Sequence, residues 1–153
     1  MSNTKSIKEQ ICIHLNEQLD RKIEVLINTI DSAKESRDND TKSSAGDKYE
    51  TGRAMMHIEV EKHEVQLSKT LKLKNDLSRI SLKKEHRKVD YGSLIKTDKG
   101  IYFISIGIGK IEVDNTIVYA ISLNSPLGKQ LKGKEKEDEV QFQGREFRIK
   151  EIA

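Results

Sequence analysis

The sequence contains one proline, one cysteine, no tryptophan and no long apolar run. The single cysteine, Cys12, excludes a disulfide within the chain and is typical of a protein in a reducing compartment. No stretch reaches the roughly 18 apolar residues that a membrane-spanning helix needs, and no apolar segment follows Met1 as it would in a signal peptide. We therefore expect a cytoplasmic protein that does not enter a membrane.

Apolar residues are also few for a chain of this length. They make up 35 % of 153 residues, and charged residues make up another 35 %. This balance is too polar for one large compact core but too apolar for a disordered chain. A long, thin helical element fits it, since most of the surface of such an element is solvated. The net charge of +3 is mild, which argues against direct sequence-specific DNA binding, because such binding needs a concentrated basic surface.

Residues 6–37 contain neither proline nor glycine and carry apolar side chains at steps of three and four. That spacing predicts one stripe of an amphipathic helix. Such a helix spans roughly 45 Å, a length that is unusual in a small globule and common in a coiled coil. The stripe consists of Ile7, Ile11, Leu15, Leu19, Ile23, Leu26, Ile30 and Ala33.

A polar segment, residues 38–46, follows and is rich in turn-forming residues. Helical periodicity resumes near Asp47 and continues to about Lys84. Two helices of similar length around a short loop favour an antiparallel hairpin over residues 1–85, with its tip near residues 38–50. Two helices of a globular bundle and a dimeric parallel coiled coil are the alternatives. The second, sparser stripe consists of Met55, Met56, Val60, Leu67, Leu71, Leu77 and Ile80.

The pattern changes after a basic segment at residues 83–88, which we interpret as a hinge. Short, β-branched, alternating segments then indicate strands. One helical turn interrupts them, since Ser125 can cap a helix, Pro126 suits its first position and Gly133 can end it. We therefore expect an α+β protein, with a small antiparallel β domain over residues 90–153. The expected strands are residues 93–97, 100–106, 110–113, 116–122, 139–143 and 146–152.

Residues 122–134 read S-L-N-S-P-L-G-K-Q-L-K-G-K, and Asp138, Glu139 and Val140 follow before a closing strand. This resembles the C-terminal signature of the bacterial Gre transcript-cleavage factors, in which S-x-N-S-P-L-x-x-x-L-x-G-K precedes G-D-E-V and a final strand. One departure is Glu137, where the family usually has glycine. The resemblance is strong over residues 120–152, moderate over residues 90–119 and weak by residue identity over the hairpin.

The resemblance implies both a fold and a partner. It implies an FK506-binding-protein-like C-terminal domain that docks at the rim of the secondary channel of RNA polymerase. It also implies that the hairpin enters the channel as a monomer, and that tip carboxylates help to hold a Mg²⁺ ion while the polymerase cleaves its own backtracked RNA. The factor would then be no enzyme and would bind no cofactor alone. The candidate polymerase-binding residues are Asn124, Ser125, Pro126 and Leu127.

The candidate metal-binding residues at the tip are Asp38, Asp40 and Asp47. Two-metal cleavage of a phosphodiester needs the second ion to be stabilised, and Mg²⁺ prefers carboxylate oxygens while keeping several waters. The Asp-x-x-Glu pair of the family is not reproduced in register, because Ser43 takes the second position when Asp40 takes the first. The tip carboxylates either reach the metal with altered spacing or are solvated loop and cap residues. Cleavage and channel binding without cleavage therefore both remain open.

Other residues offer weaker signals. His14, His57 and His63 lack the spacing of metal ligands, and Gly107-Ile-Gly109 indicates a turn rather than a phosphate loop. Fold analogy suggests a prolyl isomerase, but a chain with no Trp and three Phe offers little aromatic surface to hold a proline. A coiled-coil adaptor that dimerises through the hairpin is a further alternative, and it predicts a dimer in solution.

Overall fold

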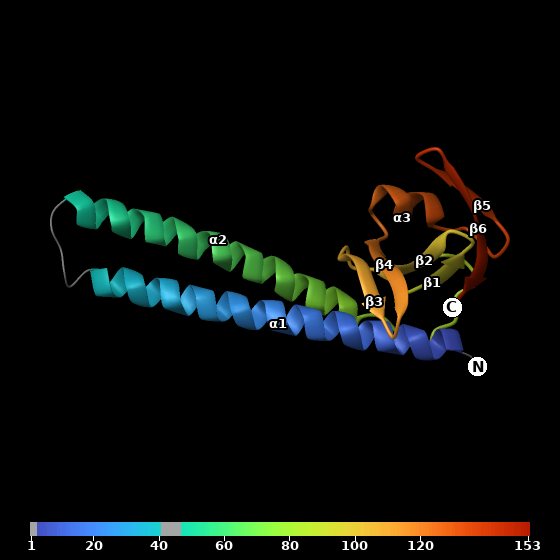
Figure 1. Cartoon of the computed structure of the whole chain (residues 1–153), viewed down its shortest axis with the longest axis horizontal. Coiled ribbons are helices and arrows are strands. Elements are labelled where there is room, and N and C mark those ends of the chain that lie inside the picture. Colours follow the sequence, from blue (N-terminus) through green and yellow to red (C-terminus); the bar gives the residue numbers. More distant parts are fainter. Residues whose placement is uncertain (1–2, 41–46) are drawn as a thin grey trace. The chain divides into compact units, whose positions relative to one another are not determined.

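The structure is a computed structural model that describes the backbone of residues 3–40 and 47–153 and the side chains of residues 7–36 and 51–153. Two long helices, α1 (Asn3–Asp40) and α2 (Asp47–Ser78), precede a six-stranded sheet and a short helix, α3 (Pro126–Leu131) (Figure 1). The predicted α+β class, a helical hairpin followed by a β domain, is confirmed. The strands are β1 (Leu94–Thr97), β2 (Gly100–Ser105), β3 (Gly109–Val113), β4 (Thr116–Ser122), β5 (Glu139–Phe142) and β6 (Arg145–Ile152).

The chain divides into two compact units. The sheet unit combines Met1–Leu15 with Asp76–Ala153, and the hairpin unit is Asn16–Asn75. Both boundaries fall within the long helices, so α1 and α2 each contribute to both units. The sheet unit is therefore built from two separate stretches of sequence.

The two helices of the hairpin unit run antiparallel (Figure 1). Lys74 forms an ion pair with Asp20, whereas Glu64, earlier on α2, lies 3.9 Å from the Lys34 ammonium, later on α1. These pairs define the register that the sequence left open. They contribute little stability, because all four side chains are at least two-fifths exposed.

The seam between the helices shows why the second stripe looked sparse. The predicted α1 stripe is buried or half-buried throughout. On α2 seven covered positions from Met56 to Leu77 recur at alternating steps of four and three, which is the heptad spacing of a coiled coil, and three of these seven are polar. The assignment of Met55 and Leu71 to the stripe is wrong, since they are 65 % and 48 % exposed. The α2 seam consists of Met56, Val60, His63, Leu67, Thr70, Lys74 and Leu77.

Helix α2 ends at Ser78, six residues before the predicted end at Lys84. The amides of Arg79 and Ile80 donate to carbonyls three residues back, so the last turn tightens. The hydroxyl of Tyr91 donates to the carbonyl oxygen of Asp76, which satisfies an acceptor that the end of a helix leaves open. Residues 79–88 therefore form an irregular segment, hereafter the joint.

The strand order in the sheet is β3-β4-β2-β1-β6-β5. Each strand agrees with its predicted range to within one residue at either end. The expectation of a wholly antiparallel sheet is wrong at one pair, since β2 and β4 are parallel, with Tyr102 opposite Tyr119. The hairpin of β3 and β4 places β3 at the sheet edge, so that β4 lies beside β2 and runs in the same direction.

Two hairpins close on two-residue turns with positive φ at both positions. Asp114 and Asn115 join β3 to β4, and Gln143 and Gly144 join β5 to β6. Positive φ at both central residues is the type I′ geometry, whose twist matches that of the flanking strands.

Both faces of the sheet are buried. One face carries Ile95 and Ile104, which pack with Leu131 of α3 and with Phe147 and Ile149 of β6. The residues that alternate with them along β1 and β2, Leu94 and Phe103, are also fully buried, because successive side chains of a strand point to opposite faces. The sheet unit thus has a layer of apolar side chains on each side of its sheet.

Candidate functional site

The tip of the hairpin holds the predicted metal-binding residues. Helix α1 continues to Asp40, so Asp38 and Asp40 belong to its last turn rather than to a loop, and Asp47 is the first residue of α2. The side chains of all three lie outside the described residues, so their part in a metal site stays a prediction. Among the residues that the structure does describe, no group of three His, Cys, Asp or Glu side chains could hold a metal ion.

The motif at residues 122–134 forms the start of α3 and its flanks. Ser125 is the N-cap, as predicted. Its hydroxyl accepts a 3.0 Å hydrogen bond from the amide of Gly128 and donates a 2.7 Å bond to the carbonyl oxygen of Ser122. Leu127 is partly buried against the core of the sheet unit, while Asn124 and Pro126 are exposed. Of the four predicted polymerase-binding residues, Asn124 and Pro126 therefore present the accessible surface, and Ser125 and Leu127 hold the turn in place.

The fold of the motif requires glycine at position 128, which was not predicted from the sequence. A Cβ atom at this position would lie 2.2 Å from the carbonyl oxygen of Ser122 and 2.9 Å from that of Leu123. Both contacts are to backbone, so no side chain can move away to make room. Only glycine allows α3 to pack this closely on the end of β4.

The end of the motif is hydrogen-bonded to the residue that directly follows the joint. The amide of Val89 donates to the carbonyl oxygen of Lys134, and the amide of Gly133 donates to the carbonyl oxygen of Val89, each at 2.9 Å. Gly133 has a φ of +80°, which favours glycine, and Leu131 is fully buried. Much of the motif is thus explained by how this part of the chain folds.

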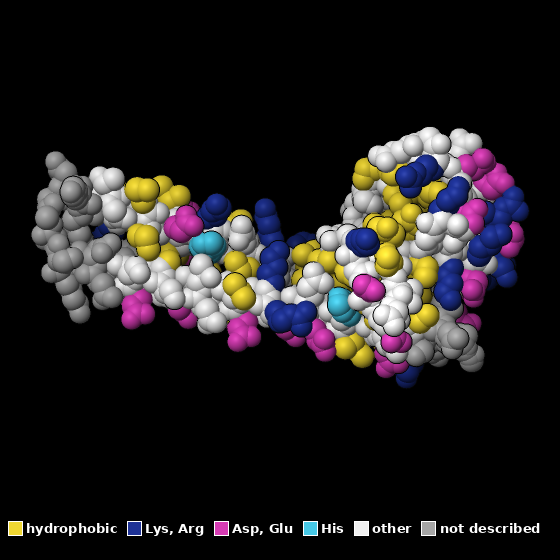
Figure 2. Space-filling model, viewed as in Figure 1, with side chains coloured by type: hydrophobic (Ala, Val, Ile, Leu, Met, Phe, Trp, Pro, Cys, Tyr) yellow, Lys and Arg dark blue, Asp and Glu magenta, His cyan; other side chains and the backbone are white. Residues whose placement is uncertain are grey.

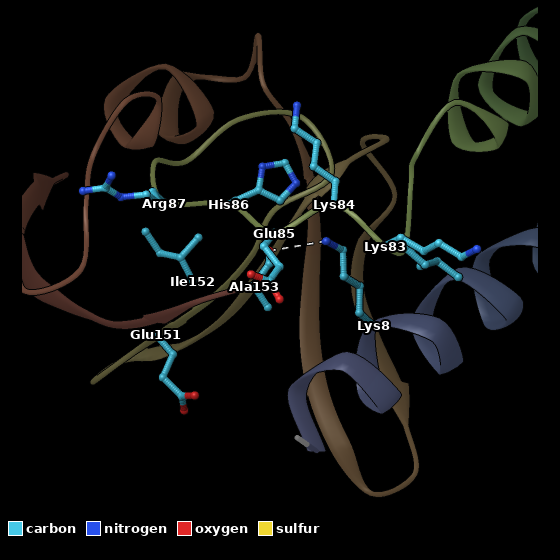
Figure 3. A pocket seen from close by; sticks show the side chains of 10 residues that line it. Lys8, Lys83, Lys84, Glu85, His86, Arg87, Glu151, Ile152 and Ala153 are labelled. Carbon is cyan, nitrogen blue, oxygen red and sulfur yellow. Dashed lines mark hydrogen bonds between the residues drawn. The ribbon is translucent and has the colours of Figure 1, made fainter. Parts of the chain in front are cut away.

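A basic cavity of about 290 Å³ lies beside the joint within the sheet unit (Figure 3). Lys8 points from α1 toward Ala153, whose backbone oxygen is 3.3 Å from the Lys8 ammonium. Burial lowers the pKa of Lys8, and the nearby Lys84 lowers it further. The imidazole of His86 is also buried, and desolvation, together with Lys8 and Lys84, lowers its pKa.

Lys8 was not predicted as a site residue, although the sequence holds a signal for it. Lys8 precedes Cys12 by four residues and Leu15 by seven, so it shares their face of α1. All three side chains are buried. A charged residue at a position of this kind indicates either a pairing partner inside the fold or a ligand.

The single thiol offers no reactive group. Burial raises the pKa of Cys12 to about 11, so the thiol stays protonated at neutral pH and is a poor nucleophile and metal ligand. Burial likewise raises the pKa of Tyr91 to about 12, which leaves its hydroxyl free to donate to Asp76.

The surface is mixed in charge. Figure 2 shows acidic and basic side chains interspersed around the β5–β6 edge, where Arg148 donates a 2.5 Å hydrogen bond to Glu139. It also shows hydrophobic side chains exposed near the first described turns of α2, where Met55 and Ile58 are 65 % and 63 % exposed. Within the described ranges, neither α1 nor α2 has a stretch apolar enough to cross a membrane.

Comparisons with known proteins show a distant likeness to a solved structure. No family model matches the sequence, and no curated protein matches it. A solved structure described as "Structure of the transcription factor Gfh1" is similar, with 18 % sequence identity and a TM-score of 0.34. The similarity covers 90 % of this chain and 92 % of that chain. At this identity and TM-score, the similarity establishes neither family membership nor function.

Proposed function

We propose that this chain is a Gre-like elongation factor that binds RNA polymerase and inserts its hairpin into the secondary channel. The observation that carries the proposal is the combination, in one chain, of a long antiparallel hairpin with a sheet unit that contains the motif of residues 122–134. In the Gre family this motif belongs to the domain that docks at the channel rim. Asn124 and Pro126, exposed beside the cap of α3, are the residues assigned to that contact.

The dimensions of the hairpin unit suit this task. From residue 16 to the end of α1 at Asp40 the helix rises by roughly 35 Å, and the unit is only two helices wide. Its apolar seam residues pack against the antiparallel helix of the same chain. A rod of this kind can carry a few carboxylates into a narrow passage.

The proposed chemistry at the tip is support of a metal ion that the polymerase holds. Asp38, Asp40 and Asp47 would supply hard oxygen ligands or orient water around the second Mg²⁺ ion, and the polymerase would cleave its own RNA. Channel binding without cleavage, as a modulator or competitor, is the companion proposal, because the Asp-x-x-Glu pair of the family is not in register here.

A second candidate function is that of a dimerising adaptor, and the exposed apolar side chains of α2 favour it. Met55, Ile58 and Val65 are at least half exposed and lie on one face of the helix, outside the seam. A second copy could cover that face. This function predicts a dimer in solution, and replacing the three residues by glutamine should dissociate it. The polymerase function predicts a monomer.

The deciding experiment is binding to core RNA polymerase in competition with a known secondary-channel factor. We expect competition, and we expect the double variant Asn124→Arg/Pro126→Ala to weaken binding at least tenfold. The matched control is Lys110→Ala, since Lys110 is exposed on β3, outside the motif. Binding that does not compete, or no binding at all, would contradict the proposal.

Cleavage is tested separately on a backtracked elongation complex. We expect Asp38→Asn and Asp40→Asn to slow RNA cleavage while leaving polymerase affinity within twofold. If the wild-type protein binds but stimulates no cleavage, the non-cleaving modulator is the function. If each variant and the wild type cleave equally fast, the substituted carboxylate is not part of the metal site.

A further inference from the structure

We propose that the basic cavity beside the joint binds a small oxyanion of the phosphate class, either free phosphate or diphosphate or the phosphate end of a nucleotide. The cavity lies wholly within the sheet unit. The proposal is independent of polymerase binding, since no residue of the tip or of residues 124–127 lines the cavity.

Lys8 is buried and lines the cavity. Its side chain is only 2 % exposed, and its one hydrogen bond within the described part of the chain is to the backbone oxygen of Ala153. That oxygen also accepts a 3.0 Å hydrogen bond from the amide of Leu94. An ammonium has three N–H donors, and the oxygen of Ala153, the last residue of the given sequence, accepts one of them. An anion in the cavity would accept a second N–H.

Positive groups outnumber negative groups around the cavity. Its lining includes four lysine or arginine side chains, two glutamates and Ala153, where the given sequence ends and a terminal carboxylate would add a third negative charge. One of the glutamates, Glu151, lies 3.8 Å from the Lys96 ammonium in an ion pair, so part of its charge is already compensated. Lys83, Lys84 and Arg87 are exposed at the rim. An entering oxyanion therefore meets a surplus of positive charge, and the guanidinium of Arg87 offers the forked donors that suit phosphate oxygens.

His86 is buried and also lines the cavity. The charged groups that act on it are Lys8 and Lys84, which lower its pKa, and Asp90, which opposes them. A neutral imidazole can donate one N–H to a phosphate oxygen. An anion bound beside Lys8 would offset the positive charge of the two lysines and so raise the pKa of His86. A rise in this pKa would therefore show that an anion occupies the cavity.

The volume limits the size of the ligand. The cavity of about 290 Å³ is at the lower end of the range for ligand sites. It shares His86, Arg87 and Ile152 with an adjoining cavity of about 330 Å³ that Lys136 also lines. The two cavities together have room for a phosphate or a diphosphate. A nucleotide would place its phosphates there and leave its base outside.

The test uses the full chain in a phosphate-free buffer of low ionic strength, titrated with inorganic phosphate, with diphosphate and with ADP, and with sodium chloride at equal ionic strength as the control. The imidazole signals of His86, assigned from His86→Gln, are followed by NMR together with the thermal midpoint. We expect saturable shifts with half-saturation in about the millimolar range and a higher pKa for His86 in the bound state. An ADP affinity within twofold of that of diphosphate assigns the site to free phosphates, and at least tenfold tighter ADP binding assigns it to a nucleotide.

Substitutions of residues that line the cavity test the proposal directly. Lys8→Met should weaken phosphate binding at least tenfold, and Lys84→Ala/Arg87→Ala, which changes only exposed side chains, should weaken it at least fivefold without loss of folding. Lys110→Met, an exposed lysine on β3, is the matched control and should bind as the wild type does. If phosphate moves the His86 signals no more than chloride does, or if the rim variant binds phosphate unchanged, the proposal is wrong.

Discussion

The backbone amide of Glu137 donates a 2.8 Å hydrogen bond to the carbonyl oxygen of Ile149. This bond joins the turn before β5 to the middle of β6. Glu137 makes it from a left-handed backbone conformation, with φ at +78°. The Gre signature that this segment resembles usually has glycine at this position, and glycine adopts positive φ without the strain that a Cβ atom introduces.

We predict that Glu137→Gly stabilises the sheet unit. A non-glycine residue in the left-handed region costs about 1–2 kcal/mol, and the added flexibility of glycine in the unfolded chain offsets about 0.5–1 kcal/mol of the gain. The net increase in the free energy of unfolding should be about 0.5–1 kcal/mol, measured by urea denaturation. Glu137→Ala removes the same carboxylate but keeps the Cβ atom, and it should give no gain. If both substitutions changed the free energy of unfolding equally, the change would come from loss of the Glu137 side chain and not from the positive φ.

Gly128→Ala should destabilise the sheet unit by about 2–3 kcal/mol, because the new methyl group overlaps fixed backbone atoms at the end of β4. Gly107→Ala is the matched control, since no atom lies within 4 Å of a Cβ placed there and its φ is not positive. The control should change the free energy of unfolding by less than about 0.5 kcal/mol. If both variants unfold at the same urea concentration, α3 does not pack as closely as described.

His63→Leu should stabilise the hairpin unit by about 1 kcal/mol. The Nδ1 atom of His63 is buried in the seam without a hydrogen-bond partner among the described residues, and a buried polar atom of this kind is unfavourable. Its Nε2 atom lies 3.3 Å from Glu59, which is half exposed, so the loss of that pair costs little. Protection of the α2 amides against hydrogen exchange provides the measurement. His57→Leu, at an exposed position of the same helix, should leave that protection nearly unchanged.

The buried His86 should make folding sensitive to mild acid. Its pKa is lowered in the folded protein, so below its ordinary pKa of about 6.5 the unfolded chain binds a proton before the folded chain does. Stability contributed by neutral His86 is then present above that pH and is lost as the pH falls toward the folded-state pKa. His86→Gln should lose less stability than the wild type between pH 7 and pH 5. Between pH 7 and pH 8 the two proteins should run in parallel, since His86 is neutral in both states there.

Local patterns predicted most of the secondary structure. Alternation located every strand to within one residue, and the residue types at Ser125 and Pro126 located the start of α3. These features depend on a few neighbouring residues, which a sequence displays directly. The α2 seam was harder to predict, because His63, Thr70 and Lys74 occupy positions at which burial comes from packing across the hairpin.

Features that depend on distant residues were not predictable. The parallel pairing of β2 with β4 arises because β3 takes the sheet edge, a choice that no local pattern records. The cavity brings Lys8 to Ala153 across the length of the chain. The clash that forbids a side chain at Gly128 is visible only once β4 and α3 are in place. For the tip, sequence supplies the carboxylates, and their part in a metal site stays a prediction.

The division of the sheet unit into two stretches of sequence also bears on how the protein folds. Met1–Leu15 joins Asp76–Ala153, so on the ribosome the first turns of α1 emerge long before the strands with which they share a unit. The hairpin unit lies between them in sequence and involves mainly contacts between helices, which form quickly, whereas pairing of distant strands is slow. We expect the hairpin unit to fold first. Its folding should bring the two stretches of the sheet unit close together and so speed their association.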